Sequence, residues 1–130
     1  MRKHIVPYQV CLILKSMGYD IPTLYGYDTL GSLYFANDSV FNFTNYNALT
    51  TGFNVSAPLY DEVFEWFRKK YKLSCFIPST PNEIKWYYFI EDLSDRRNDS
   101  EPELTPKLDT FEEAREMGLR VMIERVKKTK

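Results

Sequence analysis

The residues whose types could carry chemistry are few and lie far apart in this chain. One histidine, His4, and two cysteines, Cys11 and Cys75, are present. Nucleophilic catalysis of the Ser-His or Cys-His kind needs a histidine close to the nucleophile, and no cluster of Cys, Asp or Glu surrounds His4 in the sequence. Both cysteines lie within apolar runs, so we expect buried free thiols. The sequence therefore predicts no catalytic residue, no metal site and no bound cofactor.

The acidic residues offer two adjacent pairs, Glu91-Asp92 and Glu112-Glu113. Neighbouring side chains on a helix point about 100° apart, so such a pair does not converge on one substrate atom. The chain also lacks GxSxG, HExxH and a glycine-rich phosphate loop. We therefore expect a protein that is not an enzyme, and we keep a carboxylate-dependent hydrolase as a second alternative.

Length and charge narrow the function classes further. The chain has 130 residues, with 17 basic and 18 acidic side chains and a net charge of −1. This length fits a single domain, residues 1–130, with a core of its own. Balanced charge gives no overall field that attracts nucleic acid. The apolar N-terminal stretch is interrupted by Pro7, Gln9 and Lys15 and is too short to span a membrane, so we expect a cytoplasmic protein.

The clearest periodicity predicts a helix that begins near Ser56 and ends near Tyr71. Ser56 is placed to cap the first turn, and Pro58 fits the position where a missing N–H costs nothing. Apolar residues follow helical spacing along one side: Leu59, Val63, Trp66 and Phe67. Charged residues mark the other side: Asp61, Glu65, Arg68 and Lys69. One side of this helix is therefore expected in the core.

Two strands are predicted after this helix, at residues 73–77 and 85–91. Alternation in the second strand places Trp86, Tyr88 and Ile90 on one face and Lys85, Tyr87, Phe89 and Glu91 on the other. Charged ends mark the second face as the more solvated one. Tyr87 and Phe89 are therefore candidates for an exposed aromatic patch that binds a partner, with Lys85 beside them. The alternative is that this face packs under a long loop.

A helix is also predicted near the N-terminus, opened by Pro7 and closed by Gly18. Its apolar stripe follows helical spacing: Val10, Ile13, Leu14 and Met17. Leu12 falls outside that stripe, so the helix is apolar on more sides than one neighbour covers. We therefore take Leu12 as a further candidate for partner binding, and a second copy of the chain, in a homodimer, as the simplest partner.

Between the two predicted helices, residues 23–27 and 32–35 read as short strands of a hairpin. Gly31 supplies the left-handed position that such a loop often needs. Residues 36–55 show no sustained period and are rich in Asn and Thr, with aromatic residues interspersed. They are predicted to form a long loop pinned by those aromatic residues.

The C-terminal part begins with an acidic segment, residues 94–107, which we predict to be a flexible loop. A last helix is expected from Asp109 or Thr110, because Thr110 and Glu113 have the spacing of a capping box. Gly118 lies within its apolar stripe, which suggests a close approach to a strand or helix. Together the elements predict an α+β fold, with a small antiparallel sheet packed against two longer helices and an additional N-terminal helix.

Three short motifs carry a resemblance that covers most of the chain: Ala57-Pro58, Glu65-Trp66-Phe67 and Thr110 to Ala114. The layout resembles small uncharacterised proteins of gut-bacterial phages and integrated mobile elements. The resemblance implies a phage or mobile-element origin. It implies no activity and no site residue, because none is known for those proteins.

These observations favour a non-enzymatic protein-interaction module whose partner is another protein or a second copy. The first alternative is a single-stranded nucleic-acid binder that stacks bases on Tyr87, Tyr88 and Phe89, with Lys85 nearby. On charge grounds we do not expect nucleic acid as a partner.

Overall fold

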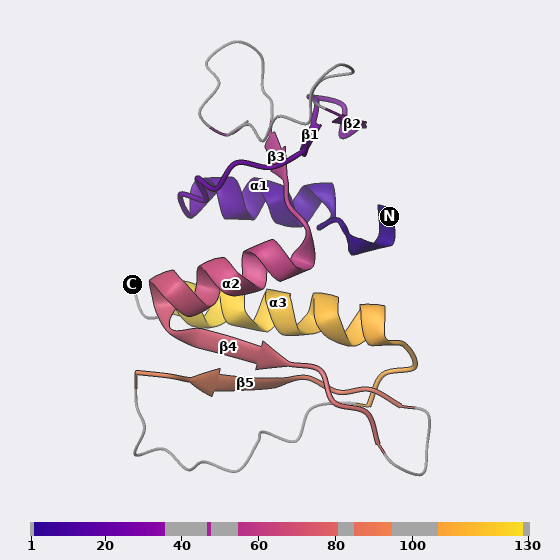
Figure 1. Ribbon diagram of the computed structural model, residues 1–130, viewed down its shortest axis with the longest axis vertical. Coiled ribbons are helices and arrows are strands. Elements are labelled where there is room, and N and C mark those ends of the chain that lie inside the picture. Colours follow the sequence, from indigo (N-terminus) through magenta and orange to yellow (C-terminus); the bar gives the residue numbers. More distant parts are fainter. Residues whose placement is uncertain (1, 36–46, 48–54, 81–84, 95–106, 129–130) are drawn as a thin grey trace. The chain divides into compact units, whose positions relative to one another are not determined.

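The computed structural model describes residues 2–35, 47, 55–80, 85–94 and 107–128, and they form an α+β structure (Figure 1). The predicted fold class is confirmed, with three α-helices and small antiparallel sheets in the described part of the chain. In chain order the elements are η1 (Arg2–His4), α1 (Tyr8–Ser16), β1 (Tyr25–Tyr27), β2 (Leu33–Phe35), β3 (Val55–Ala57), α2 (Tyr60–Tyr71), β4 (Leu73–Phe76), β5 (Phe89–Asp92) and α3 (Phe111–Lys128).

The described strands fall into two sheets, where one was expected. The first sheet has the order β2-β1-β3, and the second pairs β4 with β5; all pairs are antiparallel. The chain likewise divides into two compact units, Met1–Leu59 and Tyr60–Lys130. The single domain that the length suggests therefore stays a prediction.

In the first unit, a turn at Asp28 joins β1 to β2 as predicted. Asp28 Oδ1 accepts hydrogen bonds from the backbone N–H groups of Leu30 and Ser32, both at 2.9 Å. Gly31 adopts φ +79°, a left-handed conformation that glycine takes without steric cost. The register then pairs Tyr25 with Phe35. Local turn chemistry is enough to explain why this hairpin was predictable.

The N-terminal helix α1 ends at Ser16, and the predicted glycine, Gly18, directly follows its C-cap residue, Met17. Gly18 has φ +90° and donates to the Lys15 carbonyl, and Tyr19 donates to the Leu14 carbonyl, both at 3.0 Å. This is the Schellman arrangement, which satisfies carbonyls left open at a helix end. The buried side chains of α1 are Val10, Cys11 and Leu14.

The predicted start of the central helix is wrong by four residues, because Ser56 belongs to β3 and α2 begins at Tyr60. Ser56 pairs with Gly26 of β1 instead of capping a helix. Its N–H donates to Asn47 Oδ1 at 2.9 Å, and the Pro58 carbonyl accepts from Val6 N at 3.0 Å. The backbone at Ser56 therefore pairs within the sheet, although local propensity predicted that it would begin a helix.

In the second unit, α2 and α3 pack against the β4–β5 sheet, as expected for the two longer helices. Trp66 is buried on α2 and makes edge contacts with the rings of Phe67 and Tyr71, at centroid distances of 5.3 and 5.4 Å. The charged side of the helix holds the predicted ion pair between Glu65 and Lys69, at 3.0 Å. The prediction that this helix is amphipathic is confirmed.

The last helix begins as predicted, because the Thr110 hydroxyl accepts a hydrogen bond from Glu113 N at 3.1 Å. Farther along, α3 approaches the sheet at Gly118. A Cβ on Gly118 would lie 2.6 Å from Cys75 Sγ and 3.2 Å from Tyr88 Cβ. The close approach expected at this glycine is therefore confirmed, and its neighbours are β4 and the chain leading into β5.

Two predicted loops lie largely outside the described residues. Of the segment 36–55, Asn47 is described, together with Val55, which begins β3. Of the acidic segment 94–107, the end residues Ser94 and Lys107 are described. The long-loop and flexible-loop predictions therefore remain predictions.

Candidate functional site

The β4–β5 hairpin keeps one register along its length, and this decides which side chains share a face. Phe76 pairs with Phe89 in the sheet, and an isolated bridge joins Ser79 to Trp86. Each strand advances by three residues between these two pairs, so no residue is inserted and the alternation of side chains continues. Tyr87 N also donates to the Pro78 carbonyl at 3.1 Å. The alternation predicted for residues 85–91 therefore holds, although the regular strand is shorter, Phe89–Asp92.

One face of this hairpin carries Phe76, Tyr87 and Phe89, which we call the aromatic face. The rings of Phe76 and Phe89 stack, with centroids 6.1 Å apart and planes inclined by 27°. Phe76 is 49 % exposed, whereas Tyr87 and Phe89 are half-buried. Exposed apolar patches on a protein surface often mark sites of contact with a partner. The half-exposed Phe76 ring, beside Tyr87 and Phe89, forms such a patch.

The opposite face of the hairpin packs against α3. Tyr88 and Ile90 are buried there, and Trp86 meets the ring of Phe111 edge-on at 5.4 Å. Gly118 of α3 approaches Cys75 on the same face. Because α2 and α3 both lie on this side of the sheet (Figure 1), the aromatic face points away from both helices.

Charged residues stand at the two ends of the aromatic face. Lys85 lies at one end, where its ammonium group forms an ion pair with the Asp109 carboxylate. Glu91 lies at the other end, is exposed, and is paired in register with Ser74. The face therefore runs from a cation, over aromatic rings, to an anion.

The structure brings together three of the four residues predicted to bind a partner. Lys85, Tyr87 and Phe89 lie on one side of the hairpin, while Leu12, 37 % exposed, belongs to α1 in the first unit. The sequence reasoning missed Phe76. The register of the hairpin was the missing information, because Phe76 becomes part of the face only through its pairing with Phe89.

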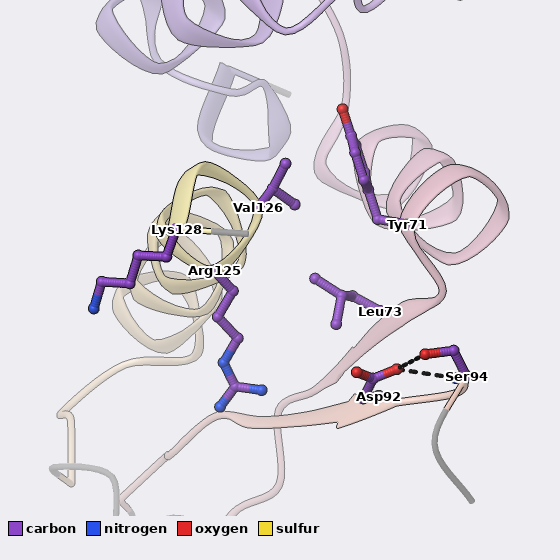
Figure 2. Close-up of a pocket in the computed structure, with 7 residues that line it drawn as sticks. All are labelled: Tyr71, Leu73, Asp92, Ser94, Arg125, Val126 and Lys128. Carbon is purple, nitrogen blue, oxygen red and sulfur yellow. Dashed lines mark hydrogen bonds between the residues drawn. The ribbon is translucent and has the colours of Figure 1, made fainter. Parts of the chain in front are cut away.

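A separate hollow of about 440 Å³ opens where α2 ends, β4 begins and α3 ends (Figure 2). Its apolar lining is Tyr71, Leu73 and Val126, and its polar lining is Asp92, Ser94, Arg125 and Lys128. Asp92 Oδ1 accepts hydrogen bonds from Ser94 N at 2.9 Å and from Ser94 Oγ at 2.6 Å. Glycoside hydrolysis by carboxylates uses a pair of acidic residues, and among the described residues the lining of this hollow has one, Asp92.

The two cysteines are buried free thiols, as predicted. Burial raises the pKa of the Cys75 thiol to about 12 and that of Cys11 further still. A thiol with a raised pKa holds little of the thiolate that acts as nucleophile or metal ligand near neutral pH. Among the described residues, no group of three or more His, Cys, Asp and Glu side chains could hold a metal ion.

No protein-family model matches the chain, and comparisons with curated proteins and with solved structures find no match either. Within the part of the chain that the structure describes, no helix has both the length and the apolar character to cross a membrane.

Proposed function

We propose that this chain is a non-enzymatic protein-interaction module and that the aromatic face makes the contact. The observation that carries the proposal is the stacked pair of Phe76 and Phe89, with Phe76 49 % exposed on the side of the sheet away from α2 and α3. Aromatic residues are enriched at protein interfaces, where their large rings supply much of the contact energy.

The charges around the face favour a protein over a nucleic acid. A stacking surface for single strands needs basic side chains that track the phosphates. Within the described residues 85–91, Lys85 is the basic residue on this face, and its ammonium group already forms an ion pair with Asp109. The chain as a whole carries a net charge of −1, which attracts no polyanion. Binding of single-stranded nucleic acid is therefore the less favoured function.

The cellular setting is part of the same proposal. The resemblance to small phage and mobile-element proteins supports an origin on such an element, and the lack of an apolar spanning segment in the sequence supports a cytoplasmic location. A small module without catalytic groups would act there by occupying a surface of its partner.

Photo-crosslinking tests the proposal. A benzophenone amino acid replaces Phe76 in one variant and Leu30 in a control variant, and both are expressed in the cells where the chain naturally occurs. Leu30 is 88 % exposed and lies in the hairpin turn of the first unit. We expect protein adducts from position 76 and none from position 30. Equal yields from the two positions, or adducts that nuclease removes, would contradict the proposal.

A further inference from the structure

We infer that the partner of the aromatic face is a second copy of this chain, held in an antiparallel, face-to-face dimer in which Lys85 of one copy meets Glu91 of the other. The inference rests on the proposed function, since it names the partner that the same surface binds. It comes from the order of side chains along one strand face: cation, ring, ring, anion.

The order of these side chains makes the face complementary to itself. Lys85 and Glu91 each lie three residues from Tyr88, and Tyr87 and Phe89 each lie one residue from it. Consider a two-fold axis that lies in the plane of contact, perpendicular to the strand and level with Tyr88. This axis relates two copies whose strands run in opposite directions. It therefore sets Lys85 against Glu91 and Tyr87 against Phe89, twice in each dimer. This is the isologous contact typical of two-fold dimers.

The other two-fold arrangement is disfavoured by charge. An axis along the strand would stack the two copies in parallel and place Lys85 on Lys85 and Glu91 on Glu91. Like charges brought together at an interface cost binding energy and suppress that arrangement. The charges of Lys85 and Glu91 thus select one orientation, while the rings supply the apolar contact.

The ion pair with Asp109 is compatible with this contact. An ammonium group has three N–H donors, so Lys85 can hold Asp109 and also meet a carboxylate from a second copy. The Lys85 side chain keeps 41 % of its surface exposed, and Asp109 keeps 73 %. The near-zero net charge of the chain, −1, leaves little repulsion between copies.

Charge reversal tests the inference. Lys85→Glu gives a face with a carboxylate at both ends, and Glu91→Lys gives a face with an ammonium group at both ends. Each variant alone would oppose like charges twice in the dimer. We expect each to raise the dimer dissociation constant by about tenfold or more relative to the unmodified chain. An equimolar mixture of the two should form a heterodimer, because every contact between them then joins opposite charges.

Sedimentation velocity over a dilution series measures the mass of each sample, and circular dichroism checks that each variant is folded. Glu65→Lys and Lys69→Glu are matched controls, since each reverses one charge of an exposed ion pair on α2 of the same unit. We expect them to leave the dimer unchanged. Lys85→Glu places a carboxylate beside Asp109 and could fail to fold. In that case a mixture of Glu91→Lys with the unmodified chain still tests the inference. We expect a smaller dimer fraction in this mixture than in the unmodified chain alone at the same total concentration.

Two results would overturn the inference. One is an unmodified chain that sediments as a monomer at every concentration; the other is a dimer that neither reversal weakens. Neither result touches the proposed function, because crosslinks from position 76 to a different protein would still support it. Absence of any protein crosslink from position 76 would contradict both the proposed function and the dimer.

Discussion

At Gly118, α3 lies close to the sheet, and the missing side chain of this residue permits the approach. Alanine is favoured over glycine inside a helix by about 1 kcal/mol, so propensity alone predicts that Gly118→Ala stabilises the protein. A Cβ there would lie 2.6 Å from Cys75 Sγ, and such overpacking costs about 1–3 kcal/mol. We expect net destabilisation by about 1 kcal/mol in urea unfolding. Cys75→Ala in the same chain should recover part of that loss, and equal effects of Gly118→Ala in both backgrounds would contradict the packing account.

The buried thiols give stability a pH dependence with a definite sign. Burial raises the pKa of Cys75 to about 12, against about 8.5 for an exposed thiol. Below pH ~8.5 both folded and unfolded states keep the proton, so the full stability is present. As the pH rises toward 12, the unfolded state ionises first and the free energy of unfolding falls, by at most about 1.4 kcal/mol per pH unit per thiol.

The thiol contribution is measured by urea unfolding at several pH values between 8 and 11. Tyrosines and lysines titrate in the same window, so the comparison is between the unmodified chain and Cys75→Ala. We expect a shallower loss of stability with pH in the variant, and Cys11→Ala repeats the test in the other unit. Parallel curves for the unmodified chain and both variants would mean that the thiols do not titrate differently on unfolding.

At the scale of elements, the α2 helix carries the largest buried ring of the second unit. Trp66 is 6 % exposed and touches Phe67 and Tyr71, and removal of such a side chain costs about 3–5 kcal/mol. Since small proteins are stable by about 5–15 kcal/mol, Trp66→Ala should leave the protein marginally folded at room temperature. Leu30→Ala, at an exposed site, is the control and should shift the thermal midpoint little. A variant Trp66→Ala with an unchanged midpoint would show that α2 is not central to the core.

Elements set by local chemistry were predictable from the sequence, and elements set by distant pairing were not. The Asp28–Gly31 turn, the Gly18 helix end and the Thr110 cap each depend on residues within a few positions. Ser56 looked like another cap, but pairing with Gly26 makes it part of a strand. Propensity is a weak prior that tertiary pairing overrides.

The candidate site shows the same limit. Tyr87 and Phe89 were found from alternation within one strand, while Phe76 needed the register between two strands. Arg115 was missed for a related reason. It follows two glutamates in the sequence of α3, yet its side chain is buried. Its guanidinium carbon lies 4.2 Å from the centroid of the Tyr60 ring and 5.1 Å from that of the Phe111 ring. A cation that stacks on aromatic rings can be accommodated in a core, and sequence spacing alone does not reveal those rings.

For the whole molecule, cooperativity of unfolding tests whether the two compact units form the predicted single domain. Both tryptophans, Trp66 and Trp86, lie in the second unit, while the described α1 and β1–β3 elements lie in the first. Tryptophan fluorescence therefore reports one unit and far-ultraviolet circular dichroism reports both. We expect coincident urea transitions, as a single cooperative domain requires. Separated transitions would show two domains.

The contact surface itself is tested most directly by isotope-filtered nuclear Overhauser measurements on a mixture of labelled and unlabelled chain. Such spectra record only contacts between different copies. We expect cross-peaks between the Tyr87 ring of one copy and the Phe89 ring of the other, and we expect them to weaken in the Glu91→Lys variant at the same concentration. Intermolecular cross-peaks confined to other surfaces, such as Leu12 on α1, or no such cross-peaks at the highest soluble concentration, would contradict it.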